Sequence, residues 1–313
     1  MAQGNSSFST VTPNLQLAWD STSLGLLKSC PKLYEYKMVL GYASRTESVH
    51  LTFGILYHQA LERYDHFKAQ GMGHEKATLR CVEWMLKATW DSRFQRPWIS
   101  DIKEKTRFTL VRTVVWYLEQ FAEDAIETII LADGKPAVEL SFRMAIDMTT
   151  AEGEQYLLCG HLDRIGKLND EYYIVDKKTS KSSIGPEFFD KFSPDNQMSL
   201  YALAGKVVYE TPIKGIIIDA AQIGVTFSRL QRGFVPRSEN QLLEWFNDTK
   251  FWISQAEAFA IAGHWPMNDK FCSMYGGCEF REICSKSPEV RQDWLSRMMT
   301  KRVWDPLSIR GDI

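Results

Sequence analysis

Two acidic residues and a lysine give the stretch Gly160–Lys178 the residue types of a metal site. The stretch has the pattern of two strands joined by a short polar turn. Side chains alternate between faces along a strand, so Asp176 and Lys178 project to one side and Lys177 to the other. Asp163 lies on the first strand, where pairing would bring it beside Asp176. Two carboxylates on one small patch repel each other unless a cation lies between them, and their oxygens suit Mg²⁺ or Mn²⁺.

Other polar residues are placed where they could join this site. His58 lies on a predicted helix, as a metal ligand or as a hydrogen-bonded core or surface group. Glu139 lies on the face of a predicted strand opposite its apolar residues, where it could be solvated or could help to hold a metal. Gln197 and Tyr201 share one face of a helix, either beside the site or as a polar edge next to a core tyrosine. The Asp-x-Lys pattern itself is also common on solvated strands.

The six cysteines indicate a second site. They are Cys30, Cys81, Cys159, Cys272, Cys278 and Cys284. The start of the chain does not resemble a signal peptide, so we expect the thiols to be reduced. A trio near the C-terminus of a protein in a reducing compartment indicates metal or cluster ligation, with the fourth ligand from elsewhere in the chain. Cys81 and Cys159 are predicted to be core thiols, as most free cysteines are.

Composition predicts a globular protein without a general affinity for nucleic acid. The 313 residues are 44% hydrophobic and 12% aromatic, enough for one large domain or two ordinary ones. The formal charge of -2 and a pI near 6.3 mean that contact with phosphates requires a local patch. The longest apolar stretch, around Gly215–Ala221, is too short to span a bilayer, so we expect a cytoplasmic protein without membrane contact. No Walker-type Gly-x-x-x-x-Gly-Lys-Ser/Thr run is present, so we expect no ATP-driven motor in this sequence.

Hydrophobic periodicity predicts an α/β fold in one domain. Helices are predicted from Ser23 and over 51–67, 75–96, 101–131, 195–209 and 241–262. In the fourth helix, Phe108, Val111, Val115 and Leu118 are on the predicted apolar face. A strand is predicted over 138–146, before the hairpin described above, and buried sheet over 215–227. The predicted organisation is a poorly ordered lead (1–22), a single domain (23–285, with a helical part to 133, a catalytic sheet and helices to 263 and a cysteine segment) and a tail (286–313).

Several short motifs follow one another in order along the chain. They are Ser29-Cys30-Pro31 followed by aromatic residues, Gly54 with His58, Leu61 and Glu62, the runs Gly160–Ile165 and Val175–Thr179, and Gln197 with Tyr201. In this order they make the chain, from about Leu24 to Cys284, resemble the RecB-like branch of the PD-(D/E)XK nucleases. The resemblance is above all to its iron-sulfur members: AddB-type nuclease domains, CRISPR-associated adaptation exonucleases and related phage proteins. The Cys-x5-Cys-x5-Cys spacing departs from many of these, which place two cysteines closer together.

The resemblance implies a restriction-endonuclease-like core, a central mixed sheet flanked by helices, that carries a metal site. His58, Asp163 and Asp176 would coordinate Mg²⁺ or Mn²⁺, with the backbone carbonyl of Lys177 as a possible further ligand. Glu139 would support a second ion.

The resemblance also implies how DNA would be cleaved. Lys178 would position or deprotonate the attacking water, and Gln197 and Tyr201 would hold the DNA strand or the lysine. The implied function is a metal-dependent DNA exonuclease in recombination, repair or phage DNA processing, acting on single strands or duplex ends. The alternatives are a non-catalytic DNA-binding subunit and a module that works only with recombination, helicase or CRISPR partner proteins.

The same resemblance implies that four of the cysteines form a ligand set. Cys30, Cys272, Cys278 and Cys284 would ligate a [4Fe-4S] cluster that fastens the first helix to the C-terminal segment. A Cys₄ zinc site is the alternative, although zinc more often uses closely paired cysteines.

Overall fold

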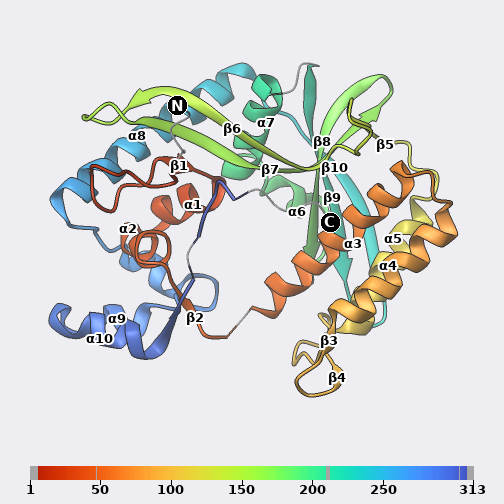
Figure 1. Cartoon of the computed structure of the whole chain (residues 1–313), viewed down its shortest axis with the longest axis horizontal. Helices are drawn as coiled ribbons and strands as arrows, with labels where there is room; N and C mark the ends of the chain where they lie inside the picture. The colour runs from red at the N-terminus through yellow and green to blue at the C-terminus, as the bar shows by residue number, and fades with distance from the viewer. Residues whose placement is uncertain (1–5, 47, 209–211, 303, 309–313) are drawn as a thin grey trace. The chain divides into compact units, whose positions relative to one another are not determined.

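The computed structural model of the chain describes residues 6–46, 48–208, 212–302 and 304–308 (Figure 1). Its contacts divide these residues into two compact units. Unit 1 takes the described residues within Met1–Thr46, Phe142–Gly160 and Ser238–Ile309, and unit 2 takes those within Glu47–Ser141 and His161–Arg237. The residues expected at the metal site fall in unit 2, whereas the four cysteines expected to ligate one cluster or metal ion fall in unit 1. A single domain over 23–285 stays a prediction.

Unit 2 is built on a mixed sheet. The strands β5 (Glu127–Thr128), β8 (Glu171–Ser180), β9 (Ile213–Ile223) and β10 (Ser228–Val235) lie in unit 2. The sheet also contains β6 (Val138–Thr149) and β7 (Gln155–Leu168), which pair with each other and of which unit 2 takes only the residues up to Ser141 and from His161. β8 is antiparallel to β7 and parallel to β9, whereas β10 is antiparallel to β9. The predicted α/β architecture with a central mixed sheet is therefore confirmed. A Cβ atom at Gly166 would lie 2.4 Å from Cγ2 of Ile126, so β5 can pair with β7 there because that position is glycine.

Helices cover both faces of this sheet. They are α3 (Val49–Ala69), α4 (His74–Ala88), α5 (Arg107–Gln120), α6 (Pro186–Asp190) and α7 (Asn196–Val208). α3, α4 and α5 pack against one another around Phe53, Tyr57 and Leu110, and α5 also packs on β9 and β10 (Figure 1). α7 packs on β8 and β9. The predicted end of this last helix at Tyr209 lies outside the described residues.

Two helices predicted in this unit are too long. α4 ends at Ala88, and a short hairpin of β3 (Trp90–Asp91) and β4 (Arg96–Pro97) follows. α5 begins only at Arg107, because Thr106 and Thr109 form a capping box there. After α5 the chain turns at Asp124, whose carboxylate binds Arg232 and the backbone N–H of Ile126. The local capping box and the tertiary contact of Asp124 thus override the helical spacing of the apolar residues.

The predicted apolar face of α5 is also partly wrong. The face that enters the core consists of Thr109, Leu110, Thr113, Val114, Tyr117 and Leu118. Phe108, which was placed on the apolar stripe, is 71% exposed. Spacing alone finds a stripe about the helix axis but not which of two overlapping stripes meets the neighbouring helices.

Unit 1 contains the N- and C-terminal segments. Its elements are β1 (Ala18–Trp19), α1 (Ser21–Ser29), α2 (Pro31–Tyr34), the π-helix η1 (Glu35–Val39), β2 (Tyr42–Ser44), α8 (Glu239–Ala262), the 3₁₀-helix η2 (Asp269–Gly276), α9 (Arg281–Cys284), α10 (Pro288–Met298) and β11 (Met299–Lys301). β1 pairs in parallel with the first half of β7, and β11 pairs with β2. The helix predicted over 241–262 is confirmed as α8.

The described part of the predicted poorly ordered lead has regular contacts. Leu15, Ala18 and Trp19 are completely buried, which supplies the free energy that fixes this segment. α1 begins before Ser23, because Asp20 is its N-cap and accepts a hydrogen bond of 2.8 Å from the backbone N–H of Ser23. Among the described helices, none is long and apolar enough to cross a bilayer.

Candidate metal centre and active site

The two central strands bring Asp163 and Asp176 to neighbouring positions. The register pairs Arg164 with Val175, so the preceding residue of β7 lies beside the following residue of β8. Oδ2 of Asp163 accepts a hydrogen bond of 2.9 Å from the backbone N–H of Lys177. Asp163 is 9% exposed and Asp176 is completely buried. The hydrogen bond therefore fixes one carboxylate beside the strand that carries the other.

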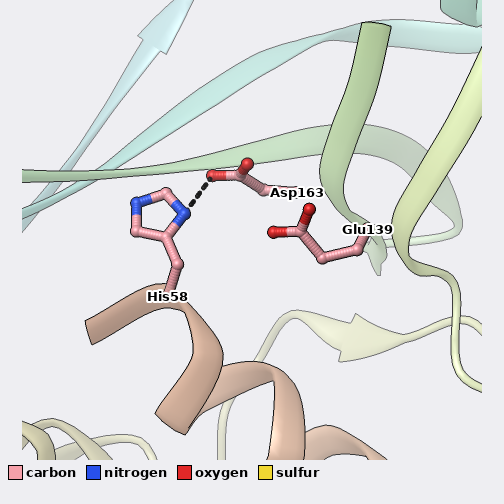
Figure 2. Close-up of side chains that lie close together, drawn as sticks. All are labelled: His58, Glu139 and Asp163. Atoms are coloured by element: carbon pink, nitrogen blue, oxygen red, sulfur yellow. Dashed lines mark ion pairs between the residues drawn. The ribbon is translucent and has the colours of Figure 1, made fainter. Parts of the chain in front are cut away.

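Three side chains from separate elements converge at one end of this pair. Nδ1 of His58, on α3, lies 3.3 Å from Oδ2 of Asp163 (Figure 2). One ligand atom from each of His58, Glu139 and Asp163 lies within 4.8 Å of the other two. Glu139 reaches this position from the start of β6, where its φ of +48° turns the backbone out of the ordinary strand conformation. The donor set of one imidazole and two carboxylates fits a divalent cation such as Mg²⁺ or Mn²⁺.

Lys178 lies on the same face of β8 as Asp176. Its Nζ is 2.6 Å from Oδ2 of Asp176, and it donates a hydrogen bond of 2.9 Å to Oε1 of Gln197. Nε2 of Gln197 in turn donates to the hydroxyl of Tyr201 at 2.9 Å. The structure thus joins the lysine to the two α7 residues that share a helix face. Apart from this ion pair, neither oxygen of Asp176 has a hydrogen-bond partner among the described residues.

The electrostatics of the cluster favour a bound cation. Burial raises the pKa of Asp176 to about 6, and repulsion from Asp163 adds to this although Lys178 opposes it. Burial also acts to raise the pKa of Asp163, but His58 and the nearby lysines outweigh it and lower that pKa. The pKa of His58 is raised despite its burial, because Asp163 attracts the charged imidazole. A buried carboxylate whose pKa is raised, and which has one oxygen without a hydrogen-bond donor, is a ready ligand for a metal ion.

Lys177 takes part through its backbone and directs its side chain elsewhere. The side chain is 3% exposed, and its Nζ lies 4.0 Å from Oδ2 of Asp65 on α3. Metal ligation by its carbonyl stays a prediction. Asp65 was not identified from the sequence, although it lies seven residues after His58 and so on nearly the same helix face. A cavity of about 360 Å³ adjoins Asp65 and Lys177, and it is also lined by Arg164 and Tyr117.

Lys105 is a second residue that the sequence did not reveal. It is only 2% exposed, and its Nζ lies 4.2 Å from the ring centroid of Phe53. Nζ also donates to Oγ1 of Thr179 at 3.2 Å, at the residue that follows Lys178 on β8. Burial lowers the pKa of Lys105 to about 8. It therefore places a cationic group next to the strand end that carries Lys178.

The four cysteines expected to ligate one cluster or metal ion lie close together in unit 1. Cys30 belongs to a small apolar core with Leu33, Phe280 and Ile283, against which Cys278 and Cys284 pack. The backbone N–H of Asn268 donates to Sγ of Cys30 at 3.4 Å.

The thiols also interact electrostatically. Burial raises the pKa of Cys284 to about 11, and the Cys278, Cys272 and Cys30 thiols contribute to the rise. All six cysteines are free thiols, and Cys81 and Cys159 are buried as predicted.

Both the sequence and the fold are similar to those of known proteins. Residues 19–285 match a family model described as the PD-(D/E)XK nuclease superfamily. A search of curated protein sequences finds no significant match. Among solved structures, a "putative exonuclease" from Eubacterium rectale is similar with a TM-score of 0.49 and 11% identity, over 87% of this chain and 89% of that chain. The structure of SSO0001 is similar with a TM-score of 0.26 and 14% identity, over 61% of this chain and 74% of that chain.

Proposed function

Because the chain belongs to the PD-(D/E)XK nuclease superfamily, we propose that it is a metal-dependent DNA exonuclease that hydrolyses phosphodiester bonds. The observation that carries the proposal is the convergence of His58, Glu139 and Asp163 next to the ion pair between buried Asp176 and half-buried Lys178. Four elements supply these side chains, and their donor set fits the divalent cations that nucleases of this superfamily use. Recombination, repair or phage DNA processing is the proposed setting.

The metal would be held by His58, Asp163 and Asp176, with Glu139 beside them for the same or a second ion. When bound, a divalent cation supplies charge that offsets the negative charge of the transition state and lowers the pKa of water. The chain's own contribution is to hold the carboxylates in place. The backbone N–H of Lys177 fixes Asp163, and the apolar strand interior around Asp176 keeps bulk water away from its carboxylate.

Lys178 would hold the attacking water and stabilise the developing negative charge. Its ammonium group contacts Asp176 and is hydrogen-bonded to Gln197, so its position is fixed from two sides. Although burial lowers its pKa, the neighbouring Asp176 and Asp163 raise it overall, which keeps the group protonated. A protonated lysine donates hydrogen bonds, and we therefore assign it positioning and charge stabilisation rather than proton abstraction.

A cleavage assay with matched variants tests the proposal. Purified protein is incubated with Mg²⁺ or Mn²⁺ and linear or circular DNA, both single- and double-stranded. Lys178→Ala and Asp176→Asn are expected to reduce metal-dependent cleavage by about 10²-fold or more, the usual effect of removing a transition-state contact. Lys214→Ala and Asp170→Asn change an exposed lysine and an exposed aspartate of the same unit, and we expect no effect.

The result also separates the alternatives. Cleavage of linear but not circular DNA supports an exonuclease, whereas cleavage of both indicates an endonuclease. Full activity of Lys178→Ala would show that the site is wrongly assigned. Binding of DNA without cleavage by the unaltered chain would favour a DNA-binding subunit or a module that requires a partner protein.

For the cysteines we propose a [4Fe-4S] cluster held by Cys30, Cys272, Cys278 and Cys284. The proposal is supported by four free thiols from segments far apart in the sequence, of which Cys30, Cys278 and Cys284 share one small core and Cys272 interacts electrostatically with Cys284. Four thiolates are the usual ligands of such a cluster. An anaerobic preparation with broad visible absorption and about four irons per chain is the expected result. A colourless protein with one zinc per chain would establish the zinc site instead.

A further inference from the structure

The solvent-facing side of α5 carries aromatic rings. Phe108 is 71% exposed and Trp116 is 45% exposed. Arg112 lies between them at helical spacing, and its guanidinium is 5.8 Å from the Phe108 ring centroid and 5.4 Å from that of Trp116. Large exposed rings that alternate with arginine are costly to leave in water unless a ligand covers them.

The same arrangement recurs on the neighbouring hairpin. Phe94, at the turn between β3 and β4, is 56% exposed, and Arg93 and Arg96 lie 5.2 Å and 5.0 Å from its ring centroid. Trp90, on β3, is 45% exposed and has the guanidinium of Arg107 at 5.9 Å. Each exposed ring on the hairpin therefore has a cation beside it.

A fifth ring extends the surface toward the turn between β9 and β10. Phe227 is 40% exposed, and Arg229 lies 5.4 Å from its ring centroid. Arg112 ties this turn to α5, because it donates a hydrogen bond of 2.6 Å to the backbone carbonyl of Val225. Arg107 ties α5 to the end of α4 through a hydrogen bond of 2.7 Å to the carbonyl of Leu86. We call the rings of Trp90, Phe94, Phe108, Trp116 and Phe227, with these arginines, the arginine–ring surface.

The arginines of this surface are not paired with any of the described acids. Within the described part of the chain, none of Arg93, Arg96, Arg107, Arg112 and Arg229 forms an ion pair with a carboxylate. By contrast, Arg164 and Arg232 in the same unit are paired with Asp124. The arginine–ring surface thus concentrates positive charge on a chain whose formal charge is -2.

We propose that the arginine–ring surface binds single-stranded nucleic acid, with bases stacked on the rings and phosphates attracted to the arginines. The inference rests on the proposed nuclease function and specifies its substrate as a single strand or a single-stranded tail. Single-strand binding proteins combine aromatic side chains with a positively charged track in this way. A duplex hides its base faces within the stack, and so offers nothing for five exposed rings to cover.

The arginine–ring surface leads to the strand end that carries Lys178. The segment between β4 and α5 begins at Trp98, whose backbone N–H donates to the carbonyl of Thr89 at 2.8 Å. The same segment reaches Thr179 at Lys105, through the hydrogen bond described above. A strand that stacks on Trp90 and Phe108 could therefore pass Lys105 toward the metal site. All of these residues belong to unit 2.

Fluorescence anisotropy of a labelled oligothymidylate tests this inference without any need for cleavage. The full-length protein is titrated in EDTA, so that the probe stays intact. Phe94→Ala, Phe108→Ala and Trp116→Ala are each expected to raise Kd by about 5- to 100-fold, the range that stacking of one base on an aromatic side chain gives. Phe251→Ala, which removes a ring 59% exposed on α8 in unit 1, is the matched control and should leave Kd unchanged.

Salt dependence and competition complete the test. Arg93→Ala should lower the slope of log Kd against log salt by about one, and unlabelled blunt duplex should compete poorly with the probe. Unchanged Kd in all three ring variants would overturn the inference. So would loss of self-association in those variants with unaltered DNA binding, because the surface would then be a protein interface. The Lys178→Ala cleavage assay is separate, so the function and this surface can each fail alone.

Discussion

Lys105 keeps an ammonium group inside unit 2 at a cost in stability. It is 2% exposed, and burial lowers its pKa from 10.5 to about 8. Between these two pH values the unfolded chain binds more protons at this site than the folded protein does. The free energy of unfolding therefore rises with pH across this window, and the full cost of the buried charge is present below pH 8.

Lys105→Met removes this cost while it keeps most of the side-chain volume. At pH 7 we expect the variant to be more stable by about 2 kcal/mol, because it avoids the cost of burying the ammonium that lowers the pKa of Lys105. The contact of the ammonium with Phe53 offsets part of that cost in the unaltered protein. The gain should almost vanish near pH 10.5. Urea denaturation at several pH values measures it, with the exposed neighbour Lys103→Met as control. A pH-independent difference would show that the group is not titrating as described.

Gln197 positions Lys178 without touching the expected metal ligands. Its amide accepts from the lysine and donates to Tyr201, each at 2.9 Å. Gln197→Ala is expected to lower kcat by about 10-fold to 100-fold, as for other residues that orient a catalytic group. Tyr201→Phe keeps the contact between Gln197 and Lys178 and should cost less. Steady-state kinetics separate the two cases, and an equal loss in both variants would contradict a role through the lysine.

At the scale of single elements, local pattern predicted what local geometry decides. Strand alternation placed Asp176 and Lys178 on one face of β8, and helical spacing placed Gln197 and Tyr201 together on α7. Such residues can be paired from the sequence because the element itself fixes their relative positions. The motif order then suggested His58 and Asp163 as their neighbours.

What depends on packing between elements could not be predicted in this way. Phe108 has helical spacing with core residues but faces solvent, because α5 turns another face to α3 and α4. Lys105 is buried only because the segment before α5 folds over β8. The ends of α4 and α5 were missed for a related reason, since a capping box and ion pairs of Asp124 override hydrophobic periodicity.

A buried ionic network joins α5 to β9 and β10. Asp219 is 1% exposed and accepts from the Tyr117 hydroxyl at 2.5 Å and from Nε of Arg232 at 3.1 Å. Asp219→Asn is expected to destabilise the protein by about 3 kcal/mol, because Arg232 loses a buried counter-charge. Asp170→Asn changes an aspartate of the exposed turn between β7 and β8 and should have no measurable effect. Thermal unfolding of both variants gives the comparison, and equal stability would mean that Asp124 alone suffices for Arg232.

At the scale of the whole molecule, the two expected metal sites belong to separate compact units. The cysteine core of unit 1 is small, with eight buried side chains that include Cys30, Phe280 and Ile283, so a bound cluster would add to its stability. Cys278→Ser is expected to lose the visible absorption and to destabilise unit 1 by several kcal/mol. Limited proteolysis should then cut first within unit 1. First cleavage within 161–237 instead would contradict this division of stability.

The interleaving of the two units along the chain has a consequence for biosynthesis. Cys30 leaves the ribosome early, whereas Cys272, Cys278 and Cys284 emerge only after more than 240 further residues. Unit 1 needs its last segment, Ser238–Ile309, before its contacts can close, whereas the described segments of unit 2 are complete by Arg237. The sheet of unit 2 can therefore fold during translation, whereas Cys30 can meet the other three cysteines only after the last segment of unit 1 has been made. A cluster or zinc ion that needs all four thiols would therefore bind only late in synthesis or after it.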